Sequence, residues 1–299
     1  MKGLPVTAEE VEIMTCLHRQ IRSLTDRVAD RRGRPILLAL RGPDNLEMCM
    51  NIGLDVKTWL EEDLVDILIA GGGYAPFTMP LEQWTELAHQ YDVPVYPCVN
   101  RQVSDCSVTE GIRAVTANWY RAGADGIYFW NLGTPCEYKT GQELLDIRQR
   151  YYSCLCEVGD PSLLIGKDKL FCVDGPVWSP YTHVSSLPPL PVSLNEDTVQ
   201  QVPLVVGDDL EVARNSGYCA RLGLRLILEG QVSSEALQVR FNGELLTDGR
   251  YIDGGIVDFS LLESQVKPGK NIIEASLGNT AGKVQLLGIQ LKLEYQTDK

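Results

Sequence analysis

The chain contains 299 residues, 44% of them hydrophobic and 22% charged, an ordinary composition for a globular protein with material for two domains. Its 40 acidic residues outnumber its 27 basic residues, and the formal charge of -13 at pH 7 repels nucleic-acid phosphates and anionic membrane surfaces. We therefore expect neither nucleic acid nor a membrane as a partner. The sequence shows no apolar stretch near the roughly 20 residues of a membrane span and no signal-peptide pattern, so it indicates no compartment.

An amphipathic helix is predicted at residues 7–31. Thr7 and Glu10 have the spacing of a capping box, in which each side chain binds the other residue's backbone amide. Apolar residues then recur every three or four positions, which is typical of a helix that packs one face on a sheet. We expect this helix on the outside of a barrel, leading into the first strand.

Four short apolar runs follow, and each is typical of a strand buried on both faces. They occupy residues 36–40, 65–70, 93–98 and 126–130. Helical patterns separate them, at residues 46–60, 81–91 and 108–121. Strands that alternate with helices predict a parallel sheet. A complete eightfold barrel needs about 250 residues and eight such units, so this α/β region is predicted to be a partial (β/α) barrel of four units.

The second half of the chain has a different pattern. A further helix is predicted at 141–158, and the apolar segment 170–173 is expected to end the barrel part. A stretch rich in Ser and Pro resembles a linker, and alternating apolar and polar residues then predict about seven short strands of a β-sandwich. Asn242 and Gly243 form a strong hairpin signal. The expected domains are a half barrel at 1–177, a linker at 178–191 and a β-sandwich at 192–299.

The residue types that usually bind metals or cofactors do not have the spacing of such a site in this sequence. The nine cysteines are scattered, and we interpret them as small buried apolar residues of a reducing compartment. Cys154 and Cys156 have one residue between them and no second pair or histidine nearby, so a zinc site is not expected. The three glycines from Gly71 to Gly73 lack the spacing and downstream acid of a dinucleotide fold. We expect no metal and no cofactor.

Several phrases of the sequence resemble one family. The segment GLDVKTWLEEDLVDIL at 53–68, preceded by LRGPD at 40–44, resembles bacterial glycosyl hydrolases of the glycosyl-hydrolase-like family ten. The phrases AGADGIY at 122–128 and VRFNGEL at 239–245 resemble the same architecture, a barrel followed by a C-terminal β-sandwich. The resemblance implies a carbohydrate ligand and a barrel that begins upstream of Met1. On this interpretation the chain is N-terminally truncated and carries about the last four βα units of a TIM barrel.

The resemblance also sets an expectation for catalysis. Glycosidases on such barrels carry paired carboxylates at the ends of the fourth and seventh strands. The fourth strand would lie outside this chain, and the presumed seventh, at 93–98, is followed by no carboxylate before Asp105. The expected function is therefore the C-terminal part of a glycoside hydrolase, incomplete as this chain alone. Two alternatives stay open: a non-catalytic carbohydrate-binding or scaffold protein, and two half barrels that associate through the open sheet edge.

Candidate site residues follow from geometry, because barrel chemistry lies at the carboxyl ends of the strands. Hydrogen-bond donors there and flat apolar faces suit a sugar better than a phosphate. The substrate-binding candidates are Arg41, Tyr74, Asn100, Arg101, Trp130 and Asn131, and weak catalytic candidates are Asp44, Asp105 and Glu137. Plainer interpretations compete. We favour Asp44 as the cap of a helix that begins at Asn45 or Leu46, Asn131 as a turn residue, and Trp130 as a core residue.

Aromatic side chains of the predicted sandwich offer another possible sugar site. Sandwiches that bind sugars present aromatic residues on a face or at loop ends. The candidates are Tyr218, Phe241, Tyr251, Phe259 and Tyr295. Because Phe241 and Phe259 fall at apolar positions of strands, we interpret most of this set as core.

Overall fold

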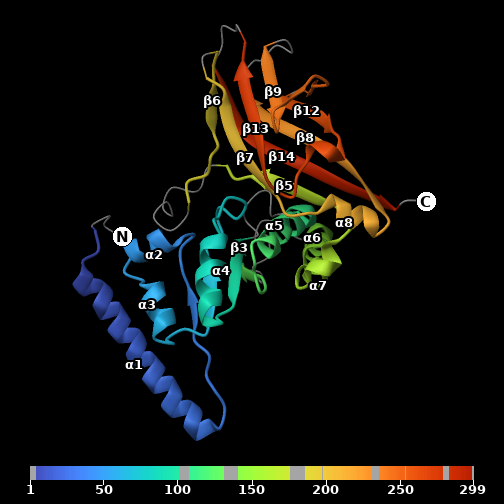
Figure 1. Ribbon diagram of the computed structural model, residues 1–299. Coiled ribbons are helices and arrows are strands. Elements are labelled where there is room, and N and C mark those ends of the chain that lie inside the picture. The colour runs from blue at the N-terminus through green and yellow to red at the C-terminus, as the bar shows by residue number, and fades with distance from the viewer. Residues whose placement is uncertain are drawn as a thin grey trace. The chain divides into compact units, whose positions relative to one another are not determined.

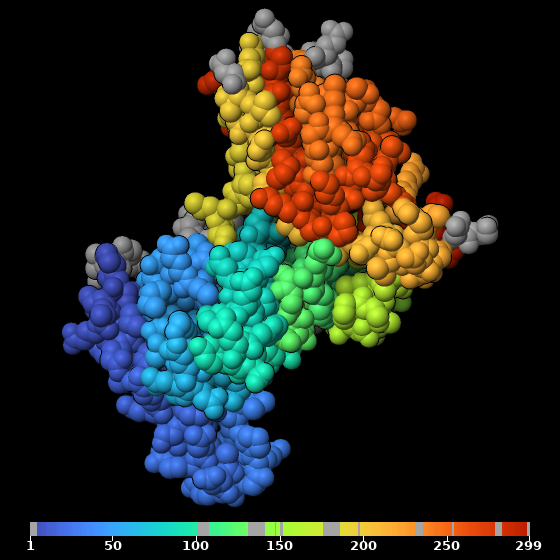
Figure 2. Space-filling model, in the orientation of Figure 1, coloured from blue at the N-terminus to red at the C-terminus, as the bar shows by residue number. Residues whose placement is uncertain are grey.

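The structure is a computed structural model that describes residues 5–100, 108–130, 141–175, 186–196, 198–230, 236–252, 254–278 and 283–297. The chain is a mixed α/β protein, and it divides into two compact units (Figure 1 and Figure 2). The parallel-sheet unit comprises Met1–Val99, Ala122–Trp130 and Trp178–Ser186. The antiparallel unit comprises Asn100–Arg121, Asn131–Val177 and Leu187–Lys299. Among the described residues, no helix combines the length and the apolar character that crossing a bilayer requires.

The parallel-sheet unit begins with the predicted long helix, α1 (Ala8–Arg32). Its capping box is confirmed, since Thr7 and Glu10 bind each other's backbone amides at 2.8 and 3.2 Å. The helix ends at Gly33, whose φ of 67° lies in the left-handed region that glycine tolerates. On the inner side of α1, the indole of Trp59 donates to the hydroxyl of Thr15 at 2.9 Å and stacks on His18.

Four strands form the curled parallel sheet in their chain order, β1-β2-β3-β4. They are β1 (Ala39–Arg41), β2 (Ile67–Ala70), β3 (Val95–Asn100) and β4 (Tyr128–Trp130). The connections carry α2 (Leu46–Asn51), α3 (Val56–Glu61), α4 (Glu82–Ala88) and the short helix η1 (His89–Tyr91). Each strand overlaps one of the predicted apolar runs. The single helix predicted at 46–60 is wrong: Gly53 has a φ of 87° and Asp55 caps a new helix, so the segment forms α2 and α3.

Most of the described helices of the antiparallel unit precede its first strand. They are α5 (Thr109–Arg121), α6 (Gly141–Ser153), α7 (Leu155–Val158), η3 (Pro161–Leu164), and later α8 (Leu210–Asn215) and η5 (Glu263–Gln265). The backbone of α5 approaches the turn at Gly207 closely, since a Cβ built there would lie 2.3 Å from the carbonyl carbon of Ala117. Beside this turn, Asn118 donates to the carbonyl oxygen of Val205 at 3.2 Å.

Two antiparallel sheets make up the rest of this unit. One has the order β10-β9-β13-β7 and the other β11-β12-β8-β14-β5, with β6 paired to β14 (Figure 1). The strands are β5 (Lys169–Val173), β6 (Val192–Leu194), β7 (Gln200–Val206), β8 (Tyr218–Glu229), β9 (Leu237–Phe241), β10 (Glu244–Leu246), β11 (Arg250–Ile252), β12 (Ile256–Leu261), β13 (Gly269–Leu277) and β14 (Val284–Thr297).

Burial in both sheets follows the predicted alternation. Leu222, Leu224, Leu226 and Leu228 of β8 are all buried, and the residues between them are more exposed. The hairpin expected at Asn242 and Gly243 is confirmed, because it joins β9 to β10. Both residues have positive φ, at 51° and 86°, as the favoured two-residue turn requires. Alternating strands thus form the antiparallel β structure that the pattern predicted.

Strand β5 differs from the expectation that its residues close the barrel part. It pairs antiparallel with β14, and Val173 lies opposite Ile289. Strand β14 has 14 residues and pairs with β8 on one side and with β6 and β5 on the other. The predicted domain boundaries at 177 and 191 stay a prediction.

Candidate functional site

The carboxyl ends of three parallel strands meet at a set of residues that we call the carboxyl edge, namely Arg41–Asp44, Gly71–Tyr74 and Trp130. Arg41 ends β1, and its guanidinium donates to the carbonyl oxygens of Gly71 (3.4 Å) and Gly72 (2.9 Å). The same guanidinium lies 3.9 Å from the centre of the Trp130 ring at the end of β4. The structure therefore brings together two of the predicted site residues through a cation–π contact.

Asp44 lies inside the carboxyl edge, with 1% of its surface exposed. One carboxylate oxygen accepts from the amide of Gly72 at 2.8 Å and the other from the amide of Ser186 at 2.6 Å. The interpretation of Asp44 as a helix cap is wrong. Its neighbour Asn45 caps α2, accepting from the amide of Met48 at 2.8 Å. Asp44 instead connects the loop at Gly72 to the segment at Ser186 through hydrogen bonds.

Burial raises the pKa of Asp44 to about 6, although the amides of Gly72 and Ser186 and the charge of Arg41 act in the opposite direction. A carboxyl group with a pKa in this range is typical of general acids in enzymes. Asp44 is nevertheless engaged through both oxygens with backbone amides. Within the carboxyl edge as defined here it is also the sole carboxylate, so these residues hold no carboxylate pair.

The loop after β2 can approach Asp44 because it begins with glycine. Gly71 has a φ of 94°, and a Cβ at this position would lie 2.4 Å from the sulfur of Met79 and 3.3 Å from a carboxylate oxygen of Asp44. A side chain there is disfavoured both by the backbone conformation and by the space. The glycine at position 71 therefore allows this loop to approach Asp44 closely.

The remaining predicted site residues lie outside the contacts of Arg41 and Asp44 described above or outside the described part of the chain. Tyr74 is half-buried in the loop after Gly73. Asn100, the last residue of β3, is buried and is the first residue of the antiparallel unit. Arg101, Asp105, Asn131 and Glu137 lie outside the described residues. Among the residues that the structure describes, no group of three or more His, Cys, Asp or Glu side chains could hold a metal ion.

A buried polar cluster in the antiparallel unit was not predicted from the sequence. Lys169 has a fully buried side chain, and its ammonium donates to the carbonyl oxygens of Leu164 (2.5 Å) and Lys167 (3.1 Å) and to Asp208 (2.9 Å). The hydroxyl of Tyr295 donates to the same oxygen of Asp208 at 2.9 Å. Burial lowers the pKa of Lys169 and raises that of Asp208. The sequence did contain a signal for this cluster, namely a lysine at the start of an apolar strand. A buried lysine needs hydrogen-bond acceptors around it.

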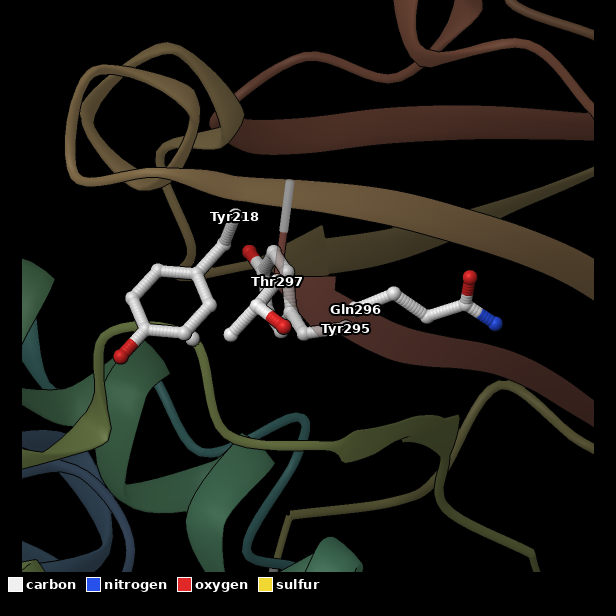
Figure 3. A pocket seen from close by; sticks show the side chains of 5 residues that line it. Tyr218, Tyr295, Gln296 and Thr297 are labelled. Atoms are coloured by element: carbon white, nitrogen blue, oxygen red, sulfur yellow. The ribbon is translucent and has the colours of Figure 1, made fainter. Parts of the chain in front are cut away.

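A surface pocket of about 750 Å³ lies beside this cluster, lined by Gly166, Tyr218, Tyr295, Gln296 and Thr297 (Figure 3). Its aromatic residues serve packing. The ring of Tyr218 lies against Gly166, where a Cβ would be 2.6 Å from the ring, and the hydroxyl of Tyr295 is bound to Asp208. Figure 3 shows the amide of Gln296 pointing away from both rings. We therefore interpret the cluster and the pocket as structural.

Comparisons with known proteins find a structural similarity. No family model matches the chain, and no curated protein matches it. Among solved structures, the chain is similar to a β-porphyranase of glycoside hydrolase family 86 from the human gut bacterium Bacteroides plebeius. The TM-score is 0.31 and the identity 13%, over 44% of this chain and 21% of that enzyme. The chain thus spans about a fifth of the enzyme's length, and at this similarity no activity can be transferred. The resemblance to family ten stays a prediction.

Proposed function

We propose that this chain is part of a carbohydrate-active protein and that its carboxyl edge binds a sugar. The observation that carries the proposal is the stacking of Arg41 on Trp130 at the ends of two parallel strands. Sugar sites combine a flat aromatic face for the CH groups of the ring with fixed polar groups for its hydroxyls. Arg41 covers one face of the half-buried indole, and we assign the other face to a sugar ring.

The finer proposal for the fold is that the four parallel strands are the last four of a TIM barrel related to glycosyl-hydrolase-like family ten. It is supported by the sequential order β1-β2-β3-β4 and by a candidate site at the carboxyl ends, where such barrels carry their sites. The other strands would come from the rest of a longer protein. A second copy of the chain is the alternative source, and the mass of the native particle distinguishes the two.

Glycosidic hydrolysis by paired carboxylates is the second candidate function. The observation in its favour is the buried carboxyl group of Asp44, whose pKa of about 6 suits a general acid. The second carboxylate would come from Asp105, from Glu137 or from strands outside this chain. The hydrogen bonds that occupy both oxygens of Asp44 favour binding without cleavage as the first proposal.

Affinity electrophoresis through gels containing neutral soluble polysaccharides tests the binding site. We expect at least one polysaccharide to retard the wild-type chain, and Trp130→Ala to weaken that binding about tenfold, the equivalent of about 1.4 kcal/mol. Trp130→Phe, which keeps a flat face, should retain most of the binding. Equal retardation of the wild type and Trp130→Ala, with circular dichroism showing both folded, would contradict a site at the carboxyl edge.

The release of new reducing ends tests hydrolysis with the same polysaccharides. Asp44→Asn is expected to abolish release and to keep binding if Asp44 is the acid. Asp105→Asn and Glu137→Gln identify its partner in the same assay. Release that persists in Asp44→Asn would remove Asp44 from the reaction.

A further inference from the structure

The six-stranded antiparallel sheet has an outer face that bears polar side chains. Leu222 and Leu224 of β8 point inward and are buried, so Arg221, Gly223 and Arg225 lie on the opposite face. A hollow of about 660 Å³ occupies this face, formed by residues of β5, β8, β11, β12 and β14. Its size lies within the range of pockets that bind small ligands. We call it the outer-face hollow.

The strand register arranges the residues of the hollow in rows across the sheet. Arg250, Asp258, Arg225 and Gln290 lie opposite one another on β11, β12, β8 and β14. In the next row on the same face, Ser260, Gly223 and Lys292 lie opposite one another. Gly223 adds no side chain, and a Cβ built there would meet nothing closer than 3.8 Å. The floor of the hollow is therefore open above Gly223, and a polar row borders it.

An ion pair in the hollow suits the hydroxyl groups of a sugar. Arg225 and Asp258 form a two-point ion pair, with N–O distances of 2.7 and 2.8 Å, while 43% and 33% of their side chains stay exposed. Such a pair presents fixed donors and acceptors to neighbouring hydroxyl groups. Tyr251 lies opposite Val257, which is fully buried, so the alternation of the strand places its ring on the other side of the sheet from this pair.

The charge of the hollow is opposite to that of the chain. Four cationic residues line it, Arg221, Arg225, Arg250 and Lys292, against two carboxylates, Asp258 and Glu294. Asp258 pairs with Arg225, and Glu294 pairs with Lys292 at 2.6 Å and faces Arg221 across the strands. Arg250 has no ion-pair partner among the residues that the structure describes. A local excess of positive charge in a chain of formal charge -13 favours an anionic ligand.

We propose that the outer-face hollow binds a short anionic oligosaccharide whose sugars carry carboxylate or sulfate groups. Arg250 and Lys292 bind the anionic group, and the Arg225–Asp258 pair binds hydroxyl groups of the sugar. The net negative charge of the chain favours a short ligand over a long polyanion. This site lies within the antiparallel unit and does not depend on the proposed site at the carboxyl edge.

Isothermal titration calorimetry with three probes tests this proposal: a galacturonate oligosaccharide, a chondroitin sulfate oligosaccharide and a neutral malto-oligosaccharide. We expect one of the two anionic probes to bind, and the one that binds identifies the anionic group. Added salt should weaken that binding, since exposed charges are screened. The neutral probe should not bind. Failure of both anionic probes, or equal binding of the neutral one, would overturn the proposal.

Matched variants locate the site. Gly223→Val fills the floor with a residue that strands favour, and Arg250→Gln removes the unpaired cation; each should weaken binding at least about tenfold. Arg240→Gln is the control, because Arg240 is an exposed arginine of the other sheet. Trp130→Ala separates this proposal from the carboxyl edge and should leave anion binding unchanged. If Trp130→Ala abolishes binding and the hollow variants do not, this proposal fails while the site at the carboxyl edge stands.

Discussion

The carboxyl edge and the outer-face hollow both contain arginine and carboxylate side chains, but the two regions hold them differently. At the carboxyl edge, backbone amides bind the carboxylate of Asp44 and backbone carbonyls bind Arg41. In the hollow, Arg225 and Asp258 bind each other and stay partly exposed. A buried charge bound by the backbone fixes loops, and its removal leaves unsatisfied groups. A partly exposed pair can exchange hydrogen bonds with a ligand at small cost to stability.

The same contrast between buried and exposed charges predicts its largest effect for two lysines on the neighbouring strands β5 and β14. Lys169 is fully buried, with two carbonyl oxygens and Asp208 as its partners, whereas Lys292 is 60% exposed. Lys169→Met should lower the free energy of unfolding by about 3–5 kcal/mol, because Asp208 loses its cation while it stays buried. Lys292→Met, the control, should change it by no more than about 0.5 kcal/mol. Urea unfolding followed by circular dichroism measures both values, and similar values for the two variants would break the contrast.

The second test uses pH at the carboxyl edge. Because the pKa of Asp44 is raised from 3.8 to about 6, the folded chain retains a proton that the unfolded chain releases in this range. The contribution of Asp44 to stability is therefore greatest below pH 3.8 and is lost as the pH rises through about 6. The loss should amount to about 3 kcal/mol.

Asp44→Asn isolates this contribution, since other titrating groups are common to both proteins. We expect the free energy of unfolding of the wild type, minus that of Asp44→Asn, to fall by about 2.4 kcal/mol between pH 4 and pH 7, because a small part of the full loss occurs below pH 4. In Asp44→Asn one carboxylate oxygen that accepts a hydrogen bond is replaced by an amide nitrogen. This loss changes the difference in free energy of unfolding by an amount that does not depend on pH. A constant difference across this range would mean that the pKa of Asp44 is not raised.

The predictable part of the fold is the part that local sequence determines. Thr7 and Glu10 specify the start of α1, and Asn242 and Gly243 specify a hairpin, because each signal lies within a few residues. The alternation of apolar runs and helices likewise predicted the order β1-β2-β3-β4. The pairing of β5 with β14 could not be predicted, because it depends on which of several apolar strands meet after the chain folds.

The candidate site also has a part that local sequence predicts and a part that depends on contacts between distant segments. Because Arg41 and Trp130 lie at the ends of predicted strands, the sequence predicted that both lie at one edge of the sheet. In the structure they are in contact. Asp44 and Asn45 are both good helix caps, so the sequence alone cannot tell which of them caps α2. The decision comes from Gly72 and Ser186, whose amides bind Asp44 from segments far away in the chain. The outer-face hollow was missed because its polar row exists only once four strands are in register.

The smallest of the three tests compares one glycine from each region. Gly71→Ala should lower the free energy of unfolding by about 2 kcal/mol, because alanine is strained at a φ of 94° and its Cβ overlaps the sulfur of Met79. Gly223→Ala should instead raise it by about 0.5 kcal/mol, since glycine weakens a strand interior and the space above Gly223 is open. Urea unfolding of both variants measures these opposite signs. Destabilisation by Gly223→Ala would mean that the floor of the hollow is already filled, and the hollow would then have no room for a sugar.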